Sequence, residues 1–294
     1  MKYDLTHTTT YEYRDPVSVS HHVLRLRPRD LPNQRCVHHD VAIDPAPSVN
    51  VLHTDYFGNA VSFVTVEGAH RVLTITSRST VNVTRPPRPD AADTPAWETV
   101  RDFCRGPQIG STLDASEFLF DSPMVAGDGG FADYARESFP RERPVFEAVM
   151  DLTRRIHCDF KFDPTATTVA TPLAEVFKRR RGVCQDFAHL QIACLRSIGL
   201  PARYVSGYLE TVPPPGQPRL AGADASHAWI AFYAQGEGWI DVDPTNNILP
   251  GTRHITVGWG RDFGDVSPVR GVILGSGDHT LKVAVDVVPM GLSR

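Results

Sequence analysis

The residue type best suited to covalent chemistry in this chain is the cysteine at position 184. Cys184 comes just before Phe187 to Ile198, an almost entirely apolar stretch that predicts a buried helix. The unpaired backbone N–H groups and the positive dipole end at a helix N-terminus favour a thiolate over a thiol. We therefore expect Cys184 to be a nucleophile.

Two later segments supply the partners that such a nucleophile needs. His227 and Asp243 follow Cys184 in the chain, which gives the set of groups required for covalent acyl transfer. Alternating residues predict strands from His227 to Tyr233 and from Trp239 to Asp243, joined by a turn. Antiparallel pairing about residue 235 would put His227 opposite Asp243 and Asp241 level with Trp229, so that Asp243 could orient the imidazole.

Other candidate residues have simpler interpretations. His189 lies about 140° around the predicted helix from Cys184, so its ring is expected to face the core. His157 follows an amphipathic helix and is expected at the surface. Asp186 and Asp224 could be charged site residues, but capping a helix and a strand start are the favoured roles. The other cysteines have no histidine-bearing context and are interpreted as structural: Cys36, Cys104, Cys158 and Cys194.

The elements that must position these residues fall into two parts. Up to about Arg85 the pattern has a period of two, which predicts strands of about 5–8 residues and an all-β sandwich. The Pro-rich stretch from Arg85 to Asp93 is a linker. Helices and strands are mixed beyond it, and we expect residues 1–90 and 91–294 to be two domains of an α+β protein. The predicted helices cover Trp97–Phe103, Val145–Ile156 and a short helix with Thr171 as N-cap and Pro172 at its first position. The predicted strands cover Ala202–Glu210, His254–Trp259 and Thr280–Val288.

Composition excludes several classes of function. The chain has 294 residues, of which 41% are hydrophobic, and a net charge of −4, so nothing supports a nucleic-acid partner. No run approaches the ~18 apolar residues of a membrane helix and no secretion signal is evident, so we expect a cytoplasmic protein without a membrane partner. Five cysteines without a CxxC pair indicate neither a disulfide framework nor a zinc site. Phosphate-binding and dinucleotide-binding motifs are absent, and we expect no cofactor and no metal.

Several segments together resemble the bacterial branch of the transglutaminase-like superfamily. The first 90 residues, with Tyr11–Tyr13 and Leu24–Arg29, are similar to the β-sandwich domain found fused to that core. The resemblance to the core lies in Arg181–His189, Gly199–Tyr208, Asp224–Trp229, Asp243–Asn246 and the closing segment Gly260–Pro268.

The resemblance implies a papain-like core with Cys184 as nucleophile, His227 as general base and acid, and Asp243 as the group that orients the imidazole. It implies a peptide or protein substrate and either hydrolysis of an amide bond or transfer of the acyl group to an amine. Relatives often have Tyr in place of Phe162, which leaves the Cys184 backbone N–H as the surer oxyanion donor. The alternative is a non-catalytic module whose N-terminal sandwich recruits a partner while the papain-like core is a scaffold.

Overall fold

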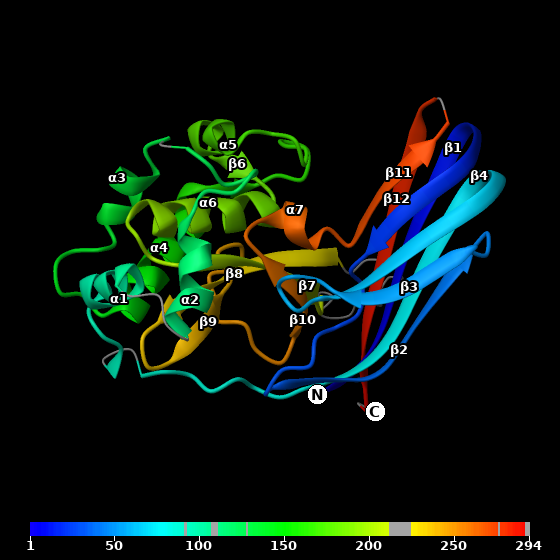
Figure 1. Cartoon of the computed structure of the whole chain (residues 1–294). Coiled ribbons are helices and arrows are strands. Elements are labelled where there is room, and N and C mark those ends of the chain that lie inside the picture. Colours follow the sequence, from blue (N-terminus) through cyan, green and yellow to red (C-terminus); the bar gives the residue numbers. More distant parts are fainter. Residues whose placement is uncertain (91–92, 107–110, 128, 212–224, 276, 292–294) are drawn as a thin grey trace, which may run out of the picture.

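A strand-rich part and a helix-rich part lie side by side in the protein (Figure 1). The computed structural model describes residues 1–294 apart from 91–92, 107–110, 128, 212–224, 276 and 292–294. Asp224 therefore lies outside the described residues, as does the Pro-rich segment from Val212 to Pro218, for which the sequence predicts a surface loop. The predicted α+β class is confirmed, because antiparallel sheets are combined with helices that cover one of them.

The strand-rich part is one six-stranded antiparallel sheet. Its strand order is β11-β1-β4-β2, and β12 and β3 pair with β1 and β4 off this path. Two strands are far longer than predicted, with 23 residues in β1 and 24 in β4. The six strands are β1 (Lys2–Leu24), β2 (Gln34–Asp44), β3 (Val49–Thr54), β4 (Ala60–Val83), β11 (Val269–Leu274) and β12 (His279–Met290).

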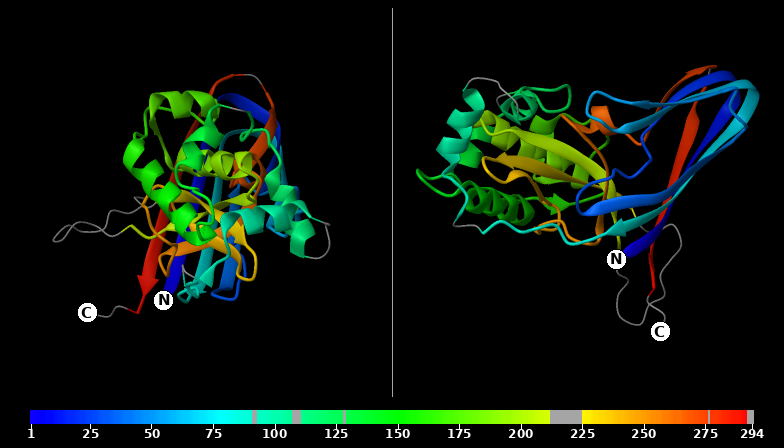
Figure 2. Two further views of the ribbon diagram at one scale, coloured as in Figure 1. Left: turned by 90° about the vertical axis from the view of Figure 1, so that its left-hand side faces the viewer. Right: turned by 60° about the horizontal axis from the view of Figure 1, so that its bottom comes forward.

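The sandwich is formed by this single sheet folding back on itself (Figure 2, right). Pairing between β1 and β4 shifts register at Val17, so Pro16 and Gly68 are accommodated as an irregularity inside two long strands. The prediction of short strands was wrong for this reason. Buried residues from both halves meet in one core: Tyr13, Val17, Leu24, Leu26, Val64, Val66, Leu73 and Ile75.

The C-terminal strands complete the N-terminal sheet. β11 and β12 both pair antiparallel with β1. The strand at Thr280–Val288 was expected in the second sheet, and this expectation was wrong, because alternation shows that a segment is a strand without showing its partner. The division of the chain into two domains near residue 90 stays a prediction. Residues 269–290, which were assigned to the second domain, form strands of the first sheet.

The helix-rich part contains a four-stranded antiparallel sheet in the order β10-β7-β8-β9. Its strands are β7 (Ala202–Leu209), β8 (Ala225–Ala234), β9 (Gly238–Val242) and β10 (His254–Gly260), and β5 (Lys161–Phe162) and β6 (Arg181–Gly182) form a small parallel pair. The helices are α1 (Trp97–Arg105), α2 (Ser111–Ser116), a 3-10 turn (Glu117–Leu119), α3 (Phe131–Arg136), α4 (Val145–Asp159), α5 (Leu173–Arg179), α6 (Cys184–Ser197) and α7 (Phe263–Val266).

Helix α6 is the centre of this part, because it packs on β7 and β8 and is buried along most of its length. The helix predicted from Val145 to Ile156 is confirmed as α4, and Val145, Val149, Leu152 and Ile156 form a fully buried stripe along it. Helix α5 begins one residue later than predicted, with Pro172 rather than Thr171 at the N-cap position. Within the described residues, none of the helices is long and apolar enough to cross a membrane.

The two parts are joined along the edge strand β10. The side-chain amide of Gln34 donates to the carbonyl of Thr256 at 2.7 Å and accepts from its N–H at 2.8 Å. Asn59 does the same for Trp259, donating at 2.9 Å and accepting at 3.0 Å. Each amide thus takes the place of a residue in a neighbouring strand, so β10 has hydrogen-bond partners on the side away from β7.

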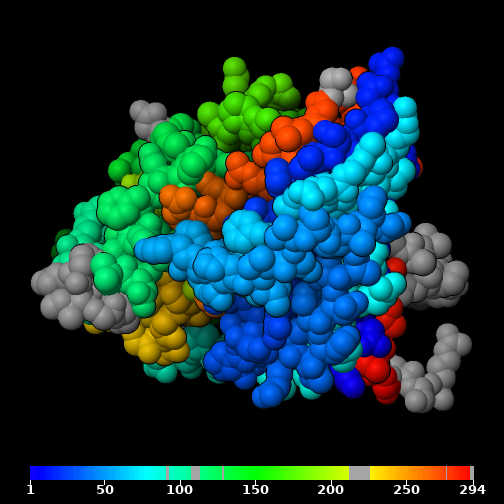
Figure 3. Space-filling model, turned by 45° about the vertical axis from the view of Figure 1, so that its right-hand side comes forward, coloured from blue at the N-terminus to red at the C-terminus, as the bar shows by residue number. Residues whose placement is uncertain are grey.

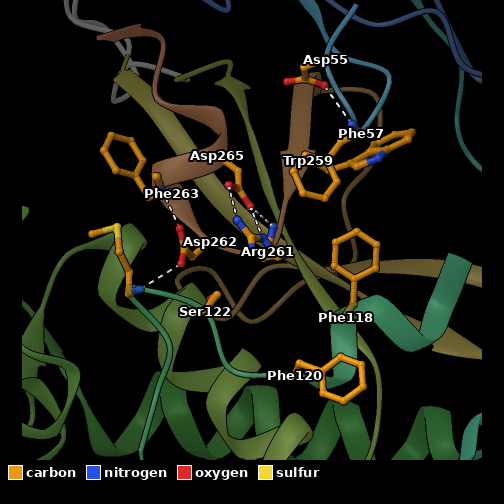
Figure 4. Close-up of polar contacts among 12 residues, drawn as sticks. Asp55, Phe57, Phe118, Phe120, Ser122, Trp259, Arg261, Asp262, Phe263 and Asp265 are labelled. Carbon is orange, nitrogen blue, oxygen red and sulfur yellow. Dashed lines mark hydrogen bonds and ion pairs between the residues drawn. The ribbon is translucent and has the colours of Figure 1, made fainter. Parts of the chain in front are cut away.

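Aromatic and charged groups reinforce the same contact. The guanidinium carbons of Arg29 and Arg203 lie 3.5 Å and 3.8 Å from the centre of the Trp259 ring, which requires opposite faces of the indole. Phe57 lies in the turn between β3 and β4, and its ring centre is 5.9 Å from that of Phe118. The Asp55 carboxylate accepts the Phe57 backbone N–H at 3.0 Å (Figure 4), and Figure 3 shows the light-blue turn region lying against the helix-rich part.

Candidate active site

The local sequence before α6 places Cys184 at the first position of the helix. Val183 is extended and serves as N-cap, and the Asp186 carboxylate accepts its backbone N–H at 2.8 Å. The same carboxylate accepts the Thr167 hydroxyl at 2.7 Å. A side chain at Gly182 would collide with Asp186. The capping role expected for Asp186 is confirmed, and it leaves Cys184 partly exposed while the rest of the helix enters the core.

His227 and Asp243 come together as predicted, although by a different strand register. Ala231 pairs with Asp241, so β9 is shifted by two residues from the predicted pairing and His227 does not lie directly opposite Asp243. The alternation is kept, and the two side chains meet diagonally, with 2.8 Å between His227 Nε2 and Asp243 Oδ2. The turn is centred one residue later than assumed, which moves every pair by two.

Asp241 belongs to a separate contact. Its carboxylate accepts the Trp229 indole N–H at 3.0 Å and faces the buried Arg203. Burial raises the pKa of Asp241, against the opposing effect of the Arg203 charge. Asp241 therefore supports the sheet beneath the site. Its contacts are with Trp229 and Arg203 and not with the His227 imidazole.

Asp243 is surrounded by N–H donors. Its Oδ2 accepts from His227, from His254 at 3.1 Å and from the Asn246 amide at 2.7 Å. Its Oδ1 accepts the backbone N–H groups of Thr245 and Asn246 at 2.9 and 3.1 Å. Burial by itself would raise the pKa of Asp243, but the hydrogen bonds from the two histidines outweigh it and hold the pKa below its ordinary value. The group is therefore a carboxylate at neutral pH.

His227 is paired with Asp243 and influenced by Cys184. Burial tends to lower the pKa of His227, but the hydrogen bond to Asp243 and the charge of that carboxylate, with a further contribution from Cys184, raise the pKa to about 10. The buried Asp243 carboxylate therefore favours the protonated imidazole at neutral pH.

The other histidines and cysteines considered as candidates have the structural positions expected for them, with one exception. His189 is buried, accepts the Phe263 N–H at 3.1 Å, and has a pKa that burial lowers to about 4, as a neutral core histidine should. His157 is exposed and lies 2.8 Å from the Thr245 carbonyl. Cys36, Cys104 and Cys194 are buried; Cys158 is the exception because it is exposed on α4 and fills no core.

The sequence reasoning missed two residues of this site, His254 and Asn246. His254 opens β10 and is 5% exposed, and it was counted only as the start of a strand. A histidine at the head of an otherwise apolar strand was the available signal. Asn246 ends the Asp243–Asn246 segment, and its side chain contacts both Asp243 and His227, at 2.7 and 3.3 Å.

The cluster of His227, Asp243 and His254 has ligand atoms close enough to hold a metal ion, all within 4.8 Å of one another. Both imidazoles are aimed at the same carboxylate oxygen, however, and the Asn246 amide donates to that oxygen as well. A cation at this point would face amide hydrogens. The donor set therefore favours a hydrogen-bonded carboxylate over a metal ligand.

Phe162 lies beside the start of α6, since it pairs with Gly182 between β5 and β6. Its ring is 52% exposed and brings no hydroxyl group to the site. Among backbone donors, the N–H of Cys184 belongs to the first turn of α6, where N–H groups have no partner within the helix.

A thiol at the start of a buried helix, packed on an antiparallel sheet that carries histidine and aspartate, defines a papain-like class of protein. Comparison with known families specifies it further. Residues 3–82 match the bacterial transglutaminase-like N-terminal region, and residues 132–244 match the transglutaminase-like superfamily. An uncharacterized protein of Mycobacterium tuberculosis is 44% identical over 98% of this chain and 93% of its own length. The chain belongs to the transglutaminase-like superfamily.

Other relatives agree with this assignment. A candidate cysteine protease from Cytophaga hutchinsonii has the same fold, with a TM-score of 0.73 and 19% identity over all of this chain and 92% of that one. A protein-glutamine gamma-glutamyltransferase of Pseudomonas aeruginosa is 28% identical over 120 residues, which is 40% of this chain and 18% of that protein.

Proposed function

We propose that the protein is a cysteine-dependent acyl-transfer enzyme acting on amide bonds, with Cys184 as nucleophile, His227 as general base and acid, and Asp243 as the group that orients the imidazole. The observation that carries the proposal is the 2.8 Å contact between His227 Nε2 and Asp243 Oδ2, and the influence of Cys184 on the pKa of His227 supports it. Family membership supports the same chemistry.

The groups can perform the reaction in two steps. The Cys184 thiolate attacks the amide carbonyl, a carbon–sulfur bond forms, and the Cys184 backbone N–H donates to the developing oxyanion. The carbon–nitrogen bond then breaks while the His227 imidazolium gives its proton to the leaving nitrogen. In the second step His227 takes a proton from water or an amine, which attacks the thioester and releases the thiolate.

An amide is the preferred substrate bond because of the leaving group. An amine leaves only if it is protonated, and His227 carries the proton required for this at neutral pH. The name of one partial relative, the protein-glutamine gamma-glutamyltransferase of Pseudomonas aeruginosa, describes chemistry at an amide. We therefore infer a peptide or protein as acyl donor, with water or an amine as acceptor.

The test is a mass-spectrometric screen of glutamine-containing peptides with and without a primary amine. Amine incorporation identifies a transferase, whereas deamidation or chain cleavage identifies a hydrolase. Cys184→Ala is the control, since it removes one sulfur atom at a helix end and should leave folding intact. If Cys184→Ala keeps more than about a hundredth of the wild-type rate, the nucleophile is wrong. If wild type modifies no peptide while binding one, the non-catalytic scaffold is the better description.

A further inference from the structure

We propose that His254 is a positioning residue of the active site, which holds the Asp243 carboxylate in place and limits how strongly it binds the proton of His227. The inference rests on the proposed function, since it assigns His254 to the same site. Its basis is the contact between His254 Nε2 and Asp243 Oδ2 at 3.1 Å, in a fully buried environment.

The surroundings of His254 indicate which ring nitrogen carries the hydrogen. The backbone N–H of Gly251 is directed at Nδ1, at 3.5 Å, so Nδ1 is placed as an acceptor. Nε2 is then the donor and points at Asp243. His254 thus acts as a neutral donor to the carboxylate, in contrast to His227, which brings a positive charge.

The ring is fixed from several sides. It meets the Trp229 indole edge to face, with 5.3 Å between ring centres. It opens β10, the strand that the amides of Gln34 and Asn59 hold from the N-terminal sheet. The backbone that carries His254 is therefore restrained by β7 on one side and by the N-terminal sheet on the other.

The physical effect follows from three donors sharing one oxygen. Asp243 Oδ2 serves His227, His254 and Asn246, and the exposed Asn246 is the least restrained of the three. Without the His254 donor, more of the carboxylate charge acts on His227, which then holds its proton more tightly, and the carboxylate is free to rotate. Both changes slow a reaction in which His227 must release that proton to the leaving group.

Among the residues that the structure describes, three titratable groups face His227. They are Cys184 from α6, Asp243 from the end of β9, and His254 from β10, whose ring centre is 6.0 Å away. Two of these are the partners of His227 in the proposed reaction. His254 is the group that can be changed while the reacting atoms are kept.

The experiment compares His254→Leu, which keeps the apolar volume without a donor, with His254→Gln, which keeps an N–H donor. The His227 imidazole is titrated by NMR in both variants and in wild type. We expect the midpoint to rise by about half a pH unit to one unit in His254→Leu, the effect of one neutral hydrogen bond, and to stay near wild type in His254→Gln. Turnover of a glutaminyl peptide should fall about 10–100-fold in kcat for His254→Leu and largely recover in His254→Gln.

Two controls separate the possible failures. His7→Leu removes another buried histidine, on β1, and should lower stability without moving the His227 midpoint. If His254→Leu does not fold, His254→Asn replaces it, because the shorter amide cannot reach Asp243. Equal midpoints in wild type and in the donor-less variant overturn the role of His254. An active Cys184→Ala variant overturns the proposed function instead.

Discussion

At the level of single residues, Asp243 and Asp241 can be used to distinguish a role in catalysis from a structural role. Asp243 accepts from His227, whereas Asp241 accepts from the Trp229 indole and faces Arg203. Asp243→Asn should lower kcat about 10²–10⁴-fold, as other triad carboxylate replacements do. Asp241→Asn should lower the melting temperature and change kcat by only a few-fold. Single-turnover acylation with circular dichroism as a folding control measures both, and the opposite ranking would reassign the third site residue.

The raised pKa of His227 makes a prediction for stability against pH. A histidine whose folded pKa lies above the ordinary 6.5 stabilises the fold fully below pH 6.5 and loses that contribution as pH rises toward about 10. The difference in unfolding free energy between wild type and His227→Gln should therefore shrink from pH 7 to pH 10. Chemical denaturation at a series of pH values measures it; a difference that grows over this range contradicts the proposed charge state.

Most residues of the site could be predicted from the sequence, because they are marked by short-range sequence patterns. Cys184 was found because a helix start has a sequence pattern, and Asp186 because a carboxylate three residues beyond the N-cap caps the helix. His227 and Asp243 followed from alternation. The strand pattern could mark His254 as an unusual residue but could not give its partner, because no spacing links a histidine on β10 to a carboxylate beyond β9.

Among the elements, β10 depends on side chains that imitate a neighbouring strand. Gln34 satisfies both backbone groups of Thr256, so Gln34→Ala leaves a buried N–H and a buried C=O without this partner. The unfolding free energy should fall by about 2–4 kcal/mol. Arg35→Ala, one residue along β2 and exposed, should change it by less than about 0.5 kcal/mol. Urea denaturation of both variants checks the difference, and equal losses would mean that the Gln34 amide is dispensable.

Gly207 sets how closely β7 approaches its neighbour. A Cβ atom there would collide with the Ile255 carbonyl of β10 and with the Trp229 ring. Gly207→Ala should cost about 3 kcal/mol and push away the strand that carries His254. Gly251→Ala is the matched control because no atom lies within 4 Å of its added Cβ. Thermal melts compare the two; a stable Gly207→Ala protein would show that β7 and β10 are loosely packed.

Helices and strands could be predicted where a short-range periodicity defines them. Strand lengths and registers could not, because they depend on how strands pair. The helices at Trp97 and Val145 and the strands of the second sheet followed from periodicity. The 23-residue length of β1 did not, because Asp15 and Pro16 are turn residues that a register shift absorbs within the paired strands. The two-residue error in the β8–β9 pairing arose in the same way, since alternation fixes the face of a strand and leaves its register open.

At the scale of the whole molecule, the two parts share a hydrophobic core. Tyr3 and Val81 from the first sheet pack with Tyr208 and Ile255 from the second, and Val287 from β12 joins them. β12 pairs with β1 over most of its length. The family assignment to two consecutive regions, residues 3–82 and 132–244, therefore does not describe two independent units.

This sharing predicts that the helix-rich part does not fold alone. A fragment of residues 91–294 keeps β11 and β12 but lacks β1, so both strands lose their hydrogen-bond partner and the shared core is exposed. We expect aggregation or a loosely packed state, whereas the full chain melts cooperatively. Limited proteolysis and near-UV circular dichroism test it, and a cooperatively folded, active fragment would show that the first sheet is an accessory.

The central claim is that an acyl group passes through the sulfur of Cys184, and the most direct measurement is the covalent intermediate itself. Wild-type protein is mixed with a reactive glutaminyl peptide, quenched in acid within one turnover, digested and mapped by mass spectrometry. The account predicts an acyl adduct on the peptide that contains Cys184, released by hydroxylamine as a thioester and lost in Cys184→Ala. Turnover without an adduct at Cys184, or an adduct on another residue that persists in Cys184→Ala, would contradict it.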